Sequence, residues 1–167
     1  MEFDSNITIK EVKDSDELLE FVMFPHDLYK DSKYWVAPIT NEELEVLDKK
    51  INPVFKNALA HYFLAYINGK IVGRVAALIN WVEVNDLKKK KVRFGWFDFI
   101  DNIEVSKALL EKVREIGIKN NLEFIEGPVG FSNMDKAGML IKGFEKKNTM
   151  ITLYNHPYYK DHMIKHG

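Results

Sequence analysis

The sequence predicts one mixed α/β (α+β) domain in which helices cover both faces of a mostly antiparallel central sheet. A hairpin is the first observation: residues 61–67 are almost all apolar, Asn68-Gly69 suits a type I′ turn, and residues 71–79 are again apolar and β-branched. The second is the segment 101–121, where apolar side chains recur at helical spacing before the short apolar run 122–125. A strand that follows such a helix is expected to pair in parallel with the strand before it.

The residues before the hairpin predict a strand and two helices. Apolar and polar residues alternate over 7–10, which indicates a short strand, and Asp14-Ser15-Asp16-Glu17 has the pattern of a capping box at a helix start. This helix is expected to end at Pro25, because the residue before proline avoids helical geometry. Thr40-Asn41-Glu42-Glu43 is a second capping box, which predicts a short helix that ends before Asn52-Pro53.

The residues after the hairpin complete the order β-α-α-β-β-β-α-β-α. Residues 92–100 predict a third meander strand, and the lysines at 88–91 are expected in its solvated approach, with phosphate binding as the alternative. Beyond the strand at 122–125, we expect a short helix over 132–140, a strand over 150–153 and a final helix over 158–165.

Composition limits the classes of function. The length of 167 residues suits a single domain, residues 1–167. A formal net charge of −1, from 24 basic and 25 acidic residues, is too balanced for a nucleic-acid binder. The chain has no cysteine, so it can form no disulfide, cysteine-zinc site or thiol nucleophile.

The apolar segments are short. The first ten residues lack the basic start and apolar run of a secretory signal, and no stretch approaches the ~18 apolar residues that span a bilayer. We therefore expect a cytoplasmic protein with no membrane partner and no nucleic-acid partner.

Ten short motifs, from about residue 21 to the end, carry a resemblance to a known family. In this order they resemble a bacterial GNAT-like family, part of the acyl-CoA N-acyltransferase superfamily, whose members continue into further strands and a second acyltransferase half. The resemblance implies the GNAT fold, truncated at its C-terminal end, and a C-terminal partner domain. The motifs are Phe24-Pro25, Leu28-Tyr29, Trp35-Val36-Ala37-Pro38, Asn52-Pro53-Val54-Phe55, Phe63-Leu64-Ala65-Tyr66, Gly73-Arg74-Val75-Ala76-Ala77, Phe94-Gly95-Trp96-Phe97-Asp98, Gly127-Pro128-Val129-Gly130-Phe131-Ser132, Gly143-Phe144 and Pro157-Tyr158-Tyr159.

The resemblance also implies a donor and its binding site. Acetyl-CoA or another acyl-CoA would be the donor, a small amine the acceptor, and no metal is needed. In the superfamily, the diphosphate of the donor binds backbone N–H groups where the fourth strand meets the long helix. Here this implies the following residues, mainly through their backbone amides: Ile100, Asn102, Ile103, Glu104, Val105, Ser106 and Lys107.

This junction departs from the superfamily pattern. Where that pattern has a basic or amide residue and then glycine or alanine, this chain has Asp101, Glu104 and Ser106. Two carboxylates would repel a diphosphate, and a side chain at Glu104 hinders the close approach that glycine permits. The alternative is that Asp101 and Glu104 only stabilise the start of the helix.

The candidate catalytic residues are Tyr159, Glu126 and Asp98. The superfamily tyrosine that protonates the leaving thiolate maps to Met163, which has no such proton, and Tyr159 lies one turn earlier on the same helical face. Glu126 and Asp98, both at predicted strand ends, are candidates for the base that deprotonates the amine. The alternative for Tyr159 is packing alone.

Two further groups have weaker patterns. His162 and His166 are spaced for one helical face and could hold a metal, but no third ligand is evident, so we expect none. Six aromatic residues are candidates for an acceptor pocket, with packing in the core as the alternative: Tyr29, Tyr34, Trp35, Trp81, Trp96 and Phe97.

Two functions therefore remain open from the sequence. The first is an acyl-CoA-dependent N-acyltransferase-like domain that acts on a small amine. The second is a non-catalytic module of the same fold that associates with a partner domain or with a second copy as a homodimer. An exposed sheet edge would favour such pairing.

Overall fold

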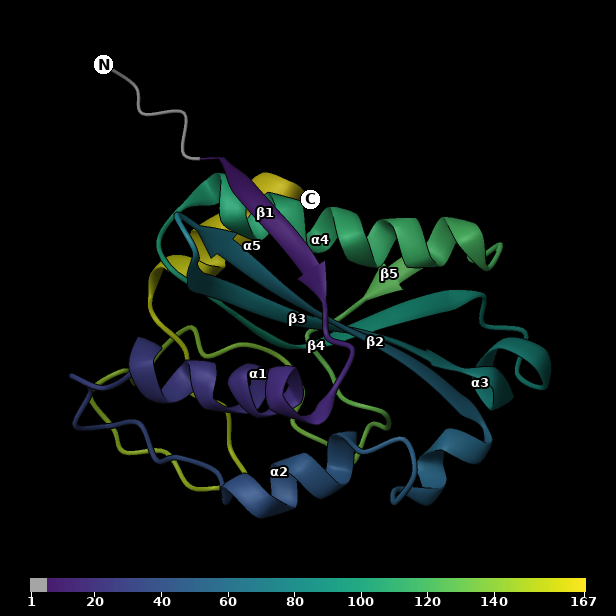
Figure 1. The fold of residues 1–167 in the computed structure, drawn as a ribbon, viewed down its shortest axis with the longest axis horizontal. Helices are drawn as coiled ribbons and strands as arrows, with labels where there is room; N and C mark the ends of the chain where they lie inside the picture. Colours follow the sequence, from purple (N-terminus) through teal and green to yellow (C-terminus); the bar gives the residue numbers. More distant parts are fainter. Residues whose placement is uncertain (1–5) are drawn as a thin grey trace.

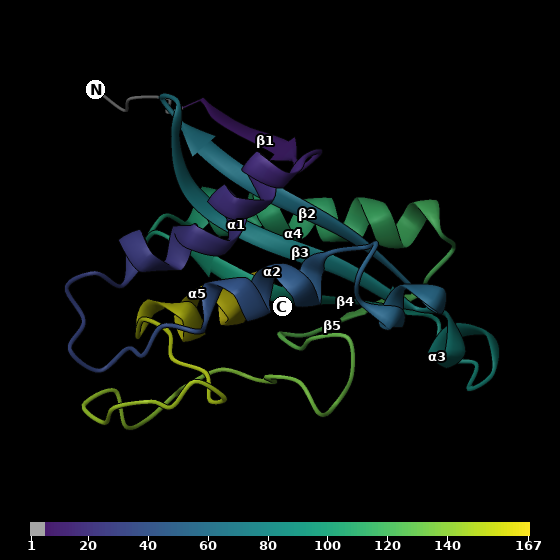
Figure 2. The ribbon, with the colours of Figure 1, turned by 60° about the horizontal axis from the view of Figure 1, so that its bottom comes forward.

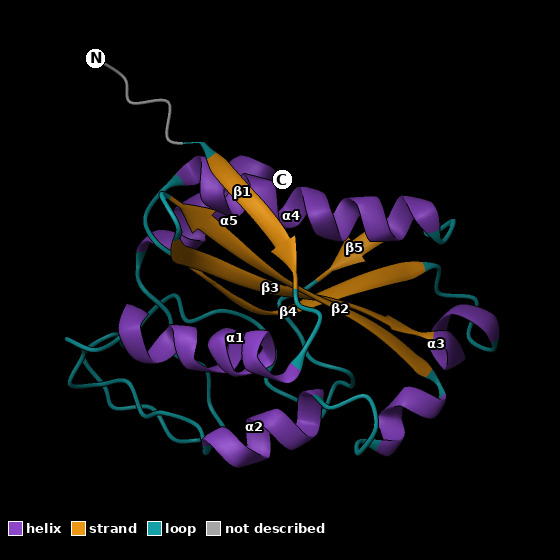
Figure 3. Ribbon diagram, viewed as in Figure 1, coloured by secondary structure: helices purple, strands orange, loops and turns teal. Residues whose placement is uncertain are grey.

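Five strands form the central sheet, in the order β1-β2-β3-β4-β5 (Figures 1 and 3). The computed structural model describes residues 6–167. The first four strands are antiparallel neighbours, and β5 is parallel to β4, as the helix between them predicts. The strands are β1 (Ile7–Glu11), β2 (Ala58–Ile67), β3 (Lys70–Asn80), β4 (Lys91–Phe99) and β5 (Phe124–Glu126).

Helices cover both faces of this sheet. In Figures 1 and 2, α1 and α2 lie on one face and α4 lies on the other, with α5 beside the N-terminal end of α4. The predicted mixed sheet with helices on both faces is confirmed. The helices are α1 (Ser15–Leu28), α2 (Thr40–Leu47), the 3-10 turn η1 (Pro53–Lys56), α3 (Trp81–Asn85), α4 (Ile103–Lys119) and α5 (Tyr158–His166).

The period of two in the strands divides the core between the two faces. Tyr62 and Leu64 of β2 belong to the cluster under α1 and α2, whereas Phe63 and Ala65 belong to the cluster under α4. The predicted hairpin turn is confirmed by the positive φ angles of 50° at Asn68 and 77° at Gly69.

Helix α1 begins as predicted but does not end at Pro25. The Asp14 carboxylate accepts hydrogen bonds from the N–H groups of Asp16 and Glu17, at 3.1 and 2.9 Å, and so caps the helix. The helix then continues through Pro25 to Leu28, so the predicted end is wrong. Proline lacks the N–H that would bind the Phe21 carbonyl, and Arg74 Nη1 of β3 donates to that carbonyl instead, at 2.8 Å.

The second capping box is also wrong. The N-cap of α2 is Ile39, and no side chain caps the helix. Glu43, expected to reach back to the helix start, instead accepts a hydrogen bond from the indole Nε1 of Trp96 at 2.8 Å. A tertiary contact has therefore replaced a local one.

The lysine run is solvated only in part. Lys88, Lys89 and Lys90 are exposed as expected, but Lys91, the first residue of β4, is buried, and so is Arg93 two positions later. Both pair with Glu83 of α3, a helix that the sequence did not predict: Arg93 Nε donates to Glu83 Oε2 at 3.0 Å, and Lys91 Nζ lies 3.4 Å from Glu83 Oε1. The second carboxylate at Lys91 is Glu126.

The long segment 127–157 has neither the predicted helix at 132–140 nor the predicted strand at 150–153 (Figure 3). Local side chains bind its backbone instead. Ser132 Oγ accepts from the Met134 N–H at 3.1 Å, and Asn155 binds both the N–H and the carbonyl of Leu140, at 2.7 and 3.1 Å. Such bonds compete with helix and sheet hydrogen bonds, which explains the irregular backbone.

Candidate active site

Strand β4 is irregular where it leaves β5. It pairs with β5 only over Lys91–Arg93, although β4 continues to Phe99. Arg74 pairs with Asp98 and Ala76 pairs with Gly95, so β4 carries an extra residue at this point, and Trp96 has a φ of 45°. Such a β-bulge re-aims side chains and is frequent beside functional sites.

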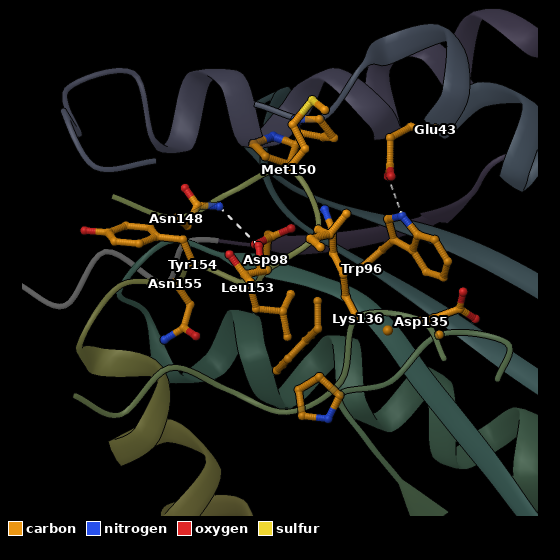
Figure 4. A pocket seen from close by; sticks show the side chains of 18 of the residues that line it. Glu43, Trp96, Asp98, Asp135, Lys136, Asn148, Met150, Leu153, Tyr154 and Asn155 are labelled. Carbon is orange, nitrogen blue, oxygen red and sulfur yellow. Dashed lines mark hydrogen bonds between the residues drawn. The ribbon is translucent and has the colours of Figure 1, made fainter. Parts of the chain in front are cut away.

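A pocket of about 370 Å³ lies at this end of β4 (Figure 4). Its walls come from α1, α2, β3, β4 and the irregular segment 127–157. The charged side chains among its lining are Glu42, Glu43, Arg74, Asp98, Asp135 and Lys136.

Asp98 is the centre of a polar network in the wall of the pocket. Its Oδ1 accepts hydrogen bonds from the hydroxyls of Tyr29 and Tyr159, at 3.0 and 3.1 Å. Its Oδ2 accepts from Arg74 Nε at 2.9 Å, and Arg74 Nη2 lies 2.8 Å away. The charges of Asp98 and Arg74 therefore compensate each other.

The two tyrosines keep their protons. Burial, and after it the charge of Asp98, raises the pKa of Tyr159 well above its ordinary value, and the same two causes act on the pKa of Tyr29. The two hydroxyl oxygens are 2.9 Å apart, and the Phe99 N–H donates to Tyr159 at 3.1 Å. The pocket thus holds two neutral phenols in contact with one carboxylate, an arrangement that can relay a proton.

The opposite wall is acidic and is held by side-chain contacts. Figure 4 shows Glu43 hydrogen-bonded to Trp96 across the pocket wall. Asn148 ties segment 127–157 to the chain between α1 and α2, because its N–H donates to the Tyr34 carbonyl at 3.0 Å and its Oδ1 accepts from the Val36 N–H at 2.5 Å. These contacts hold the connection between α1 and α2 against segment 127–157, and the pocket lies between the two.

The structure brings together two of the three candidate catalytic residues. Asp98 and Tyr159 touch each other and line the pocket, whereas Glu126 does not line it. Glu126 accepts a hydrogen bond from Lys91 Nζ at 2.5 Å, which lowers the pKa of the Glu126 carboxyl. The catalytic roles of all three stay predictions, but the geometry favours the pair.

The junction of β4 and α4 has its amides engaged within the chain. Asn102 is the N-cap: its side chain accepts from the Glu104 N–H at 3.0 Å, and its carbonyl accepts from Val105 and Ser106, at 3.1 and 3.3 Å. Asp101 itself does not cap the helix, and its Oδ1 lies 2.9 Å from His162 Nε2 of α5. Diphosphate binding at residues 100–107 stays a prediction, and it would require Asn102 to exchange its partners.

The two histidines of α5 bind a serine. His162 Nδ1 and His166 Nε2 each lie 2.8 Å from Ser106 Oγ, and the buried hydroxyl of Ser106 also donates to the Ile103 carbonyl. Over residues 6–167, no group of three or more metal-ligating side chains is found. The histidines therefore attach α5 to the start of α4.

Sequence reasoning named Tyr29 and Tyr159 but missed the roles of Arg74, Glu43 and Asn148 in the pocket wall. Four of the six aromatic candidates line the pocket, namely Tyr29, Trp35, Trp96 and Phe97. Arg74 appeared only within a family motif, and Glu43 and Asn148 received no functional role. Nothing local marks these three residues, because their partners lie 24, 53 and 112 positions away.

Solved structures with a similar fold include acetyltransferases. An aminoglycoside acetyltransferase from an uncultured soil sample, solved with sisomicin, is 15% identical; the match covers 77% of this chain and 81% of that protein, with a TM-score of 0.53. A tandem GNAT protein of the clavulanic acid pathway is 12% identical, with coverage of 70% and 34% and a TM-score of 0.55. This chain has the GNAT fold.

A third GNAT-like structure, a predicted acetyltransferase from Clostridium acetobutylicum, was solved with acetyl-CoA. It is 14% identical, with coverage of 72% and 79% and a TM-score of 0.51. At such identities the likeness concerns the fold.

Curated proteins match the GNAT-fold chain over only part of their own length. Protein YghO of Escherichia coli K12 is 29% identical over 151 residues, which is 90% of this chain and 38% of that protein. Bacterial ceramide synthase of Caulobacter vibrioides is 27% identical over 163 residues, with coverage of 95% and 42%. No family model matches the sequence.

Proposed function

We propose that this chain is an acyl-CoA-dependent N-acyltransferase-like domain whose pocket receives an amine. The observation that carries the proposal is the contact of Tyr159 with Asp98, at 3.1 Å, in the wall of a pocket beside the part of β4 that β5 does not pair. The GNAT fold supports it, because solved neighbours with this fold include acetyltransferases. A cytoplasmic location is part of the proposal.

The proposed reaction is the transfer of an acyl group from sulfur to nitrogen. The amine nitrogen attacks the thioester carbonyl, the C–N bond forms and the C–S bond breaks. The thiolate takes a proton from the Tyr159 hydroxyl, and the proton lost by the amine returns to Tyr159 through Asp98 or Tyr29. Because Tyr159 is neutral until well above its ordinary pKa, it has this proton to give.

The charges of the pocket favour a cationic acceptor. Arg74 is engaged with Asp98, and Glu43 has a neutral indole as its hydrogen-bond partner. Besides the Arg74–Asp98 pair, the lining has the carboxylates of Glu42, Glu43 and Asp135 against the single ammonium group of Lys136, so the pocket has a negative potential that attracts an ammonium group before it loses its proton.

The remaining lining favours an acceptor that also has an apolar part. Aliphatic side chains border the pocket from both sides, among them Ile39, Val46, Met150 and Ile151. One relative is called a ceramide synthase, and a ceramide is the amide of a fatty acid and a long-chain amino alcohol. We therefore include in the proposal an amine acceptor with a hydrocarbon chain.

The test combines binding with turnover. Isothermal titration with acetyl-CoA and palmitoyl-CoA measures donor binding, and a thiol reagent reports CoA release without background because the chain has no cysteine. We expect Tyr159→Phe to lower kcat by roughly 100-fold or more, the usual share of a general acid. No heat and no thiol release with either donor would refute the proposal.

Tyr158→Phe is the matched control. Its hydroxyl donates to the Phe99 carbonyl at 2.6 Å, and Tyr158 does not line the pocket. Activity of this variant should stay within a few fold of the parent, with thermal unfolding followed for both variants. Equal losses in the two variants would assign Tyr159 a structural role.

The second candidate is a non-catalytic module that associates with a partner domain or with itself. The observation in its favour is that Asn102 engages the amides of Glu104, Val105 and Ser106. Light scattering after size-exclusion chromatography tests self-association. A dimer that binds no CoA would favour this candidate over the enzyme.

A further inference from the structure

Exposed apolar side chains gather at the mouth of the pocket. Five of its lining residues are both large and exposed, and we call them the apolar rim: Ile39, Val46, Met134, Met150 and Ile151. Met134 and Ile151 are 94% and 81% exposed, values that are unusual for aliphatic side chains grouped around one opening. Exposure of such a group of apolar side chains to water is unfavourable, and this indicates an interaction surface.

The rim comes from two separate parts of the chain. Ile39 and Val46 belong to the start and the last turn of α2. The other three belong to segment 127–157, which Asn148 ties to the connection between α1 and α2. Figure 4 shows Met150 and Lys136 among the side chains at this pocket. A ligand or surface that approaches the pocket from solvent therefore meets the rim first.

Positive charge accompanies the part of the rim that segment 127–157 supplies, whereas the α2 part lies beside the carboxylates of Glu42 and Glu43. Residues 134–152 contain four lysines, Lys136, Lys142, Lys146 and Lys147, against two acidic residues, although the whole chain has a net charge of −1. Across residues 6–167, the ion pairs involve none of these four lysines. Of the two acidic residues, Asp135 accepts a hydrogen bond from the Ser132 N–H at 2.7 Å.

We propose that the mouth of the pocket docks on the surface of an anionic lipid bilayer. Aliphatic side chains enter the boundary between headgroups and acyl chains, and nearby lysines attract anionic headgroups. The apolar rim supplies the first component, and the lysines of segment 127–157, of which Lys136 lines the pocket, supply the second. Within the described residues, no helix has the length and apolar character needed to cross a membrane.

This proposal departs from the sequence-based expectation of no membrane partner. The isolated apolar residues look unremarkable in the sequence, because α2 and segment 127–157 bring them together only in the fold. The docking also suits the proposed function, since an amine with a hydrocarbon chain would pass from the bilayer into the pocket without crossing water. The lipid contact itself does not depend on catalysis.

Vesicle co-sedimentation tests the docking. The full chain is incubated with vesicles of phosphatidylcholine and phosphatidylglycerol, and with phosphatidylcholine alone. We expect binding to the mixed vesicles, and a loss of at least about tenfold for the double variant Met134→Asp, Ile151→Asp. Lys146→Gln with Lys147→Gln should weaken binding to the anionic vesicles.

The control is Ile118→Asp on α4, a residue that is 60% exposed and does not line the pocket. This variant should bind like the parent chain. Absence of parent binding, or equal binding by the rim variant, would overturn the proposal. A parent dimer that the rim variant dissociates, without vesicle binding, would assign the rim to a second copy and would also overturn it.

The two proposals can fail separately. CoA binding and thiol release are measured without lipid, so a lipid-binding chain with no transferase activity would refute only the proposed function. An active chain that ignores vesicles would refute only the docking.

Discussion

Replacing Asp98 with asparagine removes the charge that compensates Arg74. The side chains of the two residues are 14% and 7% exposed, so the pair is largely desolvated. Removing one partner of a buried ion pair costs roughly 3–5 kcal/mol, because the other charge stays buried without compensation. Asparagine still offers an oxygen to the two tyrosines, which places the expected loss near the lower value, about 3 kcal/mol.

Urea unfolding followed by circular dichroism measures this loss. For a chain of this size, about 3 kcal/mol corresponds to a decrease of roughly 6–12 °C in Tm. Asp31→Asn is the matched control, because Asp31 is exposed, and its free energy of unfolding should change by no more than about 0.5 kcal/mol.

A double-mutant cycle separates the charge from the packing. Arg74→Met alone leaves the Phe21 carbonyl and the Asp98 carboxylate without their partner. The double variant should be destabilised by less than the sum of the single variants, since it leaves no unpaired charge. Additive losses, or a loss below about 1 kcal/mol for Asp98→Asn, would refute the electrostatic account of the pocket.

Two further variants test the tyrosines and the packing of segment 127–157. Burial raises the pKa values of Tyr29 and Tyr159, so the unfolded chain loses these phenolic protons first; their stabilisation is complete below about pH 10 and decreases as the pH rises above it. Chemical unfolding at pH 8 and above pH 10 should show a steeper decline for the parent than for Tyr159→Phe, and parallel profiles would contradict this. In Gly95→Ala, the new Cβ would lie 2.5 Å from the Val129 carbonyl oxygen, a backbone atom, so we expect a loss of at least about 2 kcal/mol in thermal unfolding. Gly117→Ala meets only the Val92 side chain, at 2.9 Å, and gains helix propensity, so its loss should be smaller than that at Gly95; a larger loss there than at Gly95 would argue against the close contact.

The sequence by itself determined the elements that depend on local chemistry. Asn68-Gly69 specified the hairpin because its residues tolerate positive φ, and the helical period over α4 placed β5 parallel to β4. Asp14 specified the start of α1 because its carboxylate accepts hydrogen bonds from the first N–H groups of the helix. The candidate pair Asp98 and Tyr159 was also named from the sequence, though without any sign that the two residues touch.

The tertiary structure alone decided the hydrogen-bond partners of side chains that lie far apart in the sequence. Pro25 remains within α1 because Arg74 reaches the Phe21 carbonyl from another element, and Glu43 leaves its expected local bond for Trp96. Segment 127–157 takes its path from side-chain bonds to its backbone and from its tie to the chain between α1 and α2. Periodicity and turn chemistry act over a few residues, whereas Tyr29 and Tyr159 are separated by 130 positions and meet only in the fold, where both also contact Asp98 of β4.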